Sequence, residues 1–97
     1  MAMHNPPHPG AFILATYLEP FSISARALAE NLGVSPSTLT RIIAGKSGIS
    51  PDMALRLSKV LGRSPESWLA MQDNHNLWLA RQTARLEDIK PMEFAAV

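Results

Sequence analysis

The chain has 97 residues, of which 46% are hydrophobic and 18% charged, with a formal net charge of +1 and no cysteine. This length and composition predict one folded domain and exclude a disordered chain, while the lack of cysteine excludes a disulfide scaffold, a thiolate zinc site and a cysteine nucleophile. The small net charge excludes a protein that is basic over its whole surface, so any nucleic-acid interface must be local.

The first nine residues hold three prolines and two histidines, without any apolar period. We therefore expect residues 1–9 to form a flexible arm. The apolar segment that follows, residues 12–18, is too short to cross a membrane and lacks the basic residues that precede a secretory signal. A soluble, cytoplasmic protein is expected.

Serine and glycine mark the ends of the helices that follow. Serines able to accept a hydrogen bond from a first-turn backbone N–H stand at four helix starts, three of them before a proline: Ser24, Ser35, Ser50 and Ser64. Glycines suited to a left-handed helix end follow three apolar-periodic segments: Gly33, Gly45 and Gly62. Together with a first segment that Pro20 stops, these signals predict five helices: residues 10–18, 25–32, 36–44, 51–61 and 65 to about 86. Because no segment alternates like a strand, the predicted fold class is all-α.

The end of the chain is less sharply marked. A polar run at residues 72–76 interrupts the last helix and could bend, split or end it. Beyond Pro91, residues 91–97 are expected to be a loose tail or a short docking strand. The domain itself is predicted to span residues 10–90, with its last helix serving dimerisation or a partner.

The connection between the second and third helices is short, with only Gly33 and Val34 before the Ser35 cap. So short a connection forces a steep crossing, which is typical of a helix-turn-helix. On the third helix one stripe must face the core: Leu39, Ile42 and Ile43. The opposite stripe is small, polar or basic, so the major groove of DNA could accept it.

Arg41 is the main candidate for reading a base, because its guanidinium can donate two parallel hydrogen bonds to guanine O6 and N7. Ser37 and Thr38 can bond base edges or phosphates. Ser35 leaves the positive end of the helix near the DNA backbone, and Lys46 can place a charge on a phosphate. Two further candidates for backbone contacts are Arg26 and Thr40. Taken singly, a helix cap or a loop cation is more often structural or solvated, so the grouping of these residues favours DNA binding.

The fourth helix is predicted to be scaffold, with an outward row of Asp52, Arg56 and Lys59. The last helix carries more apolar surface than a domain of this size easily covers. We expect a homodimer or partner interface there, formed by Trp68, Met71, Trp78 and Leu79. The equally weighted alternative is that both tryptophans complete the monomer core. A symmetric dimer would set two recognition helices ~34 Å apart, which matches an inverted repeat on DNA.

No enzyme, metal or cofactor is predicted. His4 and His8 lie in the arm without further ligands, and His75 lies in the polar run without a nucleophile elbow or paired carboxylates. The rival to a DNA-binding protein is a protein-interaction module that keeps the helix-turn-helix only as a scaffold.

Two stretches, Ala-Leu-Ala-Glu-Asn-Leu-Gly-Val-Ser at residues 27–35 and Ala-Gly-Lys at 44–46, resemble the helix-turn-helix of Cro and cI-type repressors, also called the XRE family. Three more segments resemble the HigA antitoxin branch, also labelled virulence-associated protein I: residues 8–10, 49–57 and 64–69. The resemblance spans about residues 8–80 and implies a five-helix, lambda-repressor-like DNA-binding domain. It also implies a dimer that represses its own promoter and neutralises a HigB-like, RNA-cleaving toxin. The alternative is a solitary transcriptional regulator without a toxin partner.

Overall fold

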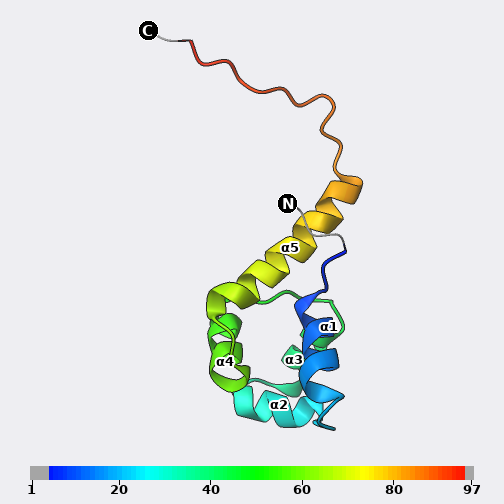
Figure 1. The fold of residues 1–97 in the computed structure, drawn as a ribbon, viewed down its shortest axis with the longest axis vertical. Coiled ribbons are helices and arrows are strands. Elements are labelled where there is room, and N and C mark those ends of the chain that lie inside the picture. The colour runs from blue at the N-terminus through cyan, green and yellow to red at the C-terminus, as the bar shows by residue number, and fades with distance from the viewer. Residues whose placement is uncertain (1–4, 96–97) are drawn as a thin grey trace.

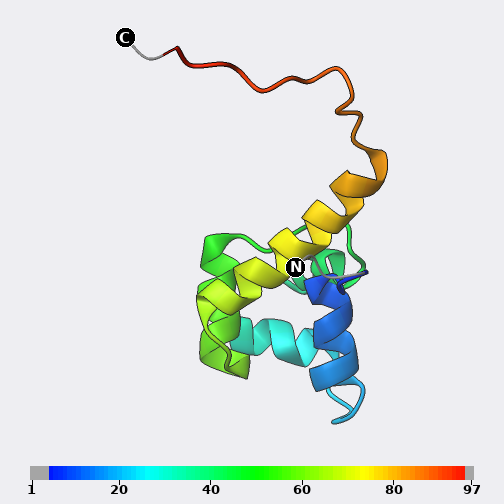
Figure 2. The same cartoon turned by 45° about the horizontal axis from the view of Figure 1, so that its top comes forward.

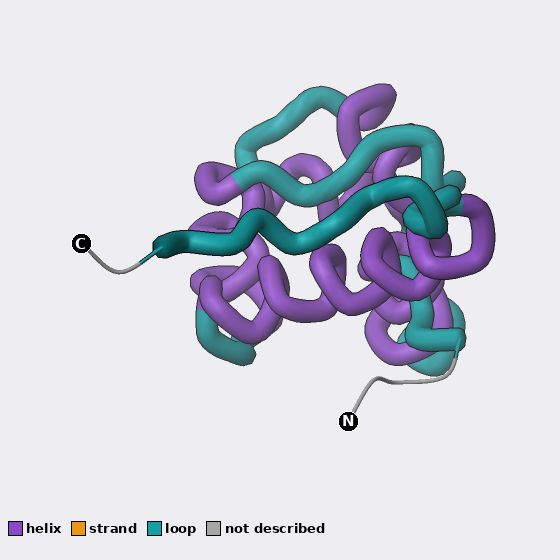
Figure 3. The backbone as a smooth tube through the Cα atoms, turned by 90° about the horizontal axis from the view of Figure 1, so that it is seen from above, coloured by secondary structure: helices purple, strands orange, loops and turns teal. Residues whose placement is uncertain are grey.

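The computed structural model describes residues 5–95 as helices joined by loops, and no strand occurs in that range (Figures 1 and 3). The helical segments are α1 (Pro9–Ile13), η1 (Leu14–Leu18), α2 (Ala25–Leu32), α3 (Pro36–Ile43), α4 (Pro51–Leu61) and α5 (Pro65–Thr83). Because η1 continues α1 without a break, the two together are the first of the five predicted helices. The all-α prediction is confirmed.

The four predicted serine caps all form. Each serine Oγ accepts a hydrogen bond from the backbone N–H three residues later, at 3.0–3.2 Å. The first helix has a cap that the sequence did not reveal, since Nδ1 of His8 accepts from the N–H of Gly10 at 2.9 Å. Capping side chains thus set the start of every helix that follows a loop.

Glycine ends two helices in different ways. Gly33 has φ 72° and ψ 32°, which is the predicted left-handed conformation, and the next N–H bonds back to the carbonyl of Ala29. Gly62 also has a positive φ, of 90°, but its ψ of −163° lies outside the left-handed helical region. Both positions favour glycine because a side chain is strained at positive φ.

The second half of the first helix is a π-helix, where an ordinary α-helix was expected. Glu19 N–H donates to the carbonyl of Leu14, five residues earlier, at 2.9 Å. In this wider turn, residues five apart lie about one turn apart. Ile13 and Leu18 therefore both face the core, and both are buried.

The core draws side chains from every helix. Its buried apolar members are Ile13, Leu18, Leu28, Ala29, Leu32, Leu39, Ile42, Ile49, Met53, Ala54, Leu57 and Trp68. Trp68 is 0% exposed, donates from Nε1 to the carbonyl of Gly62 at 3.0 Å, and packs edge-on to Phe12. Of the two equally weighted predictions for Trp68, the interface is wrong and the monomer core is confirmed, because the indole is fully enclosed.

Part of the predicted N-terminal arm is packed. Pro6 is buried, and its carbonyl accepts a hydrogen bond from Nδ1 of His75 in α5 at 2.9 Å. The rings of His8 and His75 meet edge-to-face at 5.1 Å. Residues 5–9 thus lie against α5, in contrast to the flexible arm that the sequence predicts, while residues 1–4 fall outside the described range.

The last helix runs without a break to Thr83, so the polar run at 72–76 does not interrupt it. Beyond it, residues 84–95 are exposed and leave the body as an extended segment with one turn, closed by the N–H of Ile89 on the carbonyl of Leu86 (Figures 1 and 2). Within residues 5–95, no helix is both long enough and apolar enough to cross a membrane.

Candidate nucleic-acid interface

One face of α3 is polar and open to solvent. Leu39 and Ile42 are buried and Ile43 is half-buried, as the stripe predicts, while Ser37 and Arg41 are exposed on the other side. The helix contacts both α1 and α2 on its apolar side. It contains no acidic residue, so its open face does not repel phosphate.

Three hydroxyl groups gather at the start of α3. Ser35 Oγ accepts from the N–H of Thr38 at 3.2 Å, and it lies 2.8 Å from Thr38 Oγ1 and 3.2 Å from Ser37 Oγ. All three residues are exposed. Hydroxyls at the positive end of a helix suit contact with a phosphate or a base edge. The structure thus brings together three of the predicted site residues.

Three exposed cations flank these hydroxyls in the chain: Arg26 near the start of α2, Arg41 in the last turn of α3, and Lys46 in the following loop. Among residues 5–95 the ion pair that forms is between Asp52 and Arg56, so none of the three is neutralised there. A cation without an internal partner can bond an external phosphate or base without first losing a salt bridge.

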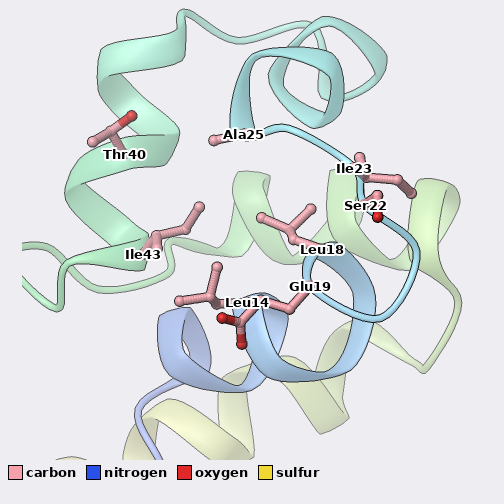
Figure 4. A pocket seen from close by; sticks show the side chains of 8 residues that line it. All are labelled: Leu14, Leu18, Glu19, Ser22, Ile23, Ala25, Thr40 and Ile43. Atoms are coloured by element: carbon pink, nitrogen blue, oxygen red, sulfur yellow. The ribbon is translucent and has the colours of Figure 1, made fainter.

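Thr40 differs from the other candidates. Its Oγ1 donates to the carbonyl of Pro36 at 2.8 Å, so its hydrogen is already used. The side chain lines an apolar groove of about 280 Å³ between η1, the start of α2, and α3 (Figure 4). The groove's other lining residues are Leu14, Leu18, Glu19, Ser22, Ile23, Ala25 and Ile43. Thr40 is consequently a weaker candidate for DNA contact than Ser37 or Thr38.

Arg56 holds the turn of the helix-turn-helix. Its Nη1 donates to the carbonyl of Leu32 at 2.8 Å and to that of Gly33 at 3.3 Å, while its Nε donates to Asp52 at 2.8 Å. A cation at the carboxyl end of α2 also complements the helix dipole. From the sequence, Arg56 was expected in an outward row, because periodicity on α4 does not reveal which neighbouring helix lies beside it.

Two further contacts hold α3, and neither was predicted. Gly10 of α1 lies against the backbone of Ile42 and Ile43, where an added Cβ would overlap main-chain atoms. Gln72 of α5 accepts the N–H of Ile49 at 3.0 Å, which fixes the loop that follows α3. In the sequence, Gln72 stands out only as part of a polar run that could break the helix.

Comparison with known proteins agrees with this geometry. Residues 14–68 match the model of the family described as Helix-turn-helix (HTH_3). The chain is also similar to virulence-associated protein I of Dichelobacter nodosus, at 44% identity over 75 residues, which are 77% of this chain and 69% of that protein.

Two solved structures extend the match. One is an addiction module antidote protein of the HigA family from Coxiella burnetii, with a TM-score of 0.83 and 32% identity over 93% of this chain and 100% of that one. The chain belongs to the helix-turn-helix family, in its HigA branch. The other is the Pseudomonas aeruginosa antitoxin HigA with the higBA promoter, with a TM-score of 0.78 and 35% identity over 91% of this chain and 99% of that one. The family resemblance that the sequence indicated is confirmed.

In this HigA-family chain, the remaining interface candidates lie on α5. Met71 and Trp78 are half-buried, and Leu79 is 46% exposed. Leu77, which was not predicted, is 49% exposed beside them. Between residues 5 and 95 no group of three or more histidine, aspartate or glutamate side chains is placed to hold a metal ion.

Proposed function

We propose that this HigA-family chain is a DNA-binding antitoxin that represses its own promoter and neutralises a HigB-like, RNA-cleaving toxin. The observation that carries the proposal is the open polar face of α3, where Arg41 and the hydroxyls of Ser35, Ser37 and Thr38 are exposed on a helix without acidic residues. The similarity to an antitoxin HigA with its promoter supports the same role. Both roles are binding roles in the cytoplasm and need neither a catalytic group nor a cofactor.

In this proposal Arg41 reads a guanine in the major groove, while Ser37 and Thr38 bond base edges or phosphates. Ser35, Lys46 and Arg26 contact phosphates and so set the register of the protein on the duplex. Thr40 makes a further, secondary contact with the DNA in this proposal.

The operator is an inverted repeat, and the chain binds it as a homodimer. We assign the interface between the two copies to α5, through Met71, Trp78 and Leu79. Apolar side chains that stay exposed on a helix are what a partner's surface covers.

A fluorescence titration tests the DNA-binding role. The native chain is titrated onto a duplex from its own promoter and onto a scrambled duplex, at several salt concentrations. We expect at least tenfold tighter binding to the promoter, equivalent to about 1.4 kcal/mol, and a steep fall with salt. Arg41→Ala should remove the preference, while Lys59→Ala, which changes an exposed lysine on α4, should keep it.

Equal and weak binding to both duplexes, whatever stands at position 41, would instead favour a protein-interaction module. The toxin-neutralising role has its own test, in which any small protein encoded by a gene adjacent to that of this chain is expressed alone and together with it. Growth arrest that this chain relieves supports an antitoxin. Without such arrest, the chain is a solitary transcriptional regulator.

A further inference from the structure

Gln72 is the one polar or charged side chain that is buried between residues 5 and 95. Both ends of its amide are bonded: Oε1 accepts from the N–H of Ile49 at 3.0 Å, and Nε2 donates to Oδ1 of Asn76 at 3.1 Å. A buried amide is costly unless it is hydrogen-bonded, so these two bonds hold the side chain in one orientation. Gln72 therefore fastens the backbone at Ile49 to α5.

The segment that Gln72 fastens is the loop of residues 44–50, which carries Lys46. Its first half is tied to α3, because the N–H groups of Lys46 and Ser47 both donate to the carbonyl of Arg41, at 2.9 and 3.3 Å. Its second half is tied to α5 through Gln72, and the side chain of Ile49 is buried in the core. Lys46 belongs to the first attachment and stands three residues before Ile49, which Gln72 holds.

The fit between this loop and Gln72 is close. A Cβ added at Gly48 would lie 3.1 Å from Oε1 of Gln72, which is tighter than an ordinary van der Waals contact. The loop thus follows a path that the amide of Gln72 determines. That path sets where the exposed ammonium group of Lys46 stands relative to the open face of α3.

We propose that Gln72 is a positioning residue for DNA binding. It does not touch DNA; by holding Ile49 it places the loop so that Lys46 meets a phosphate while Arg41 is in the groove. This inference rests on the proposed DNA-binding function. It predicts that a side chain on α5, the helix to which we assign the dimer interface, controls a phosphate contact made beside α3.

The test uses the full chain with Gln72→Met, which keeps the length of the side chain but removes both hydrogen bonds. The matched control is Asn76→Ala, which removes the partner of Nε2 and leaves the bond to Ile49 in place. Each is titrated onto the fluorescent promoter duplex at several salt concentrations, alone and combined with Lys46→Ala. Circular dichroism tests whether each variant is folded.

We expect Gln72→Met to bind the promoter at least about fivefold more weakly, with a salt slope lower by about one phosphate contact. Lys46→Ala should then add little to Gln72→Met, because both changes remove the same contact. Asn76→Ala should bind within about twofold of the native chain and keep its slope. A measurement without DNA is the hydrogen exchange of the Ile49 amide, which should be at least about tenfold faster in Gln72→Met only.

If the native chain does not prefer the promoter, the proposed function fails and this inference with it. If the native chain prefers the promoter and Lys46→Ala lowers the slope, but folded Gln72→Met binds like the native chain, the inference alone is overturned. Should Gln72→Met fail to fold, Gly48→Ala takes its place, because it displaces Oε1 without removing the amide. It should lower both affinity and slope in the same direction, and unchanged values would overturn the inference.

Discussion

The backbone of Gly10 in α1 lies directly against the backbone of Ile42 in α3, with no room for a side chain between them. A Cβ at position 10 would overlap the carbonyl group of Ile42, which cannot move without shifting α3. We expect Gly10→Ala to lower the free energy of unfolding by about 3 kcal/mol, measured by urea denaturation.

The control for this steric effect is Gly45→Ala, where an added Cβ would meet nothing within 4 Å. Its cost should be about 1 kcal/mol, because only the positive φ of 75° is strained. Equal costs for the two variants would show that the approach of α1 to α3 is not the reason for glycine at position 10.

Arg56→Met should loosen the turn between α2 and α3. The change removes the hydrogen bonds to the carbonyls of Leu32 and Gly33 but keeps an apolar stem of similar length. Since the side chain is 41% exposed, we expect a loss of only about 1–2 kcal/mol of stability. Preference for the promoter duplex over a scrambled one should also fall, which the fluorescence titration measures.

Two variants on the same helix separate this effect from a general loss of charge. Lys59→Met removes an exposed cation. Asp52→Asn removes the negative charge that pairs with Arg56, and the side chain of Asp52 is 72% exposed. Each should change stability by less than about 0.5 kcal/mol, as is usual for surface charges. If either change lowered the preference for the promoter as much as Arg56→Met does, the hydrogen bonds from Arg56 to the turn would not be the cause of that loss.

The stability of the fold should decrease as the pH drops below the ordinary pKa of a histidine side chain. Burial, and secondarily the neighbouring His75, lower the pKa of His8 from its usual 6.5. At neutral pH the imidazole is mostly uncharged in the unfolded chain and more completely so in the folded one, where its Nδ1 caps Gly10. Below pH 6.5 the unfolded chain takes up the proton more readily than the folded one, which cannot protonate Nδ1 without losing the cap.

We therefore expect the free energy of unfolding to decrease from pH 7 toward pH 5, by at most about 1.4 kcal/mol per pH unit for this one proton. Denaturation of the native chain and of His8→Asn over this range measures the effect. Asparagine can cap a helix but does not titrate, so its curve should be flatter. Parallel curves would mean that His8 does not carry the pH dependence.

Leu79→Glu should weaken the proposed homodimer. The side chain is 46% exposed on α5, and a carboxylate there would have to be desolvated on association. We expect the dimer dissociation constant to rise at least tenfold, or about 1.4 kcal/mol, in sedimentation equilibrium. Leu55→Glu on α4 is the control, since Leu55 is 60% exposed and outside the proposed interface. A native chain that sediments as a monomer at micromolar concentration would contradict the dimer.

What the sequence by itself determined is the set of helices and the face of α3 that stays open. The local signals are the serine caps, the prolines at first helical positions and Gly33. Each acts on backbone groups within about four residues, so it can be recognised without knowing the fold. The buried stripe of α3 follows from its period in the same way. These local signals also predicted the cluster of Ser35, Ser37 and Thr38, because one helix end holds all three.

The tertiary structure decided which side chains leave their own helix to hold another. Trp68, for which an interface and the core were equally expected, is enclosed by the core, and Arg56, expected in solvent, bonds the end of α2. Gln72 reaches a backbone amide 23 residues away, and Gly10 is glycine because α3 passes beside it. Periodicity shows which face of a helix is apolar, but not which element packs against that face. Contacts between elements distant in sequence depend on how the helices cross, and only the folded chain brings those partners together.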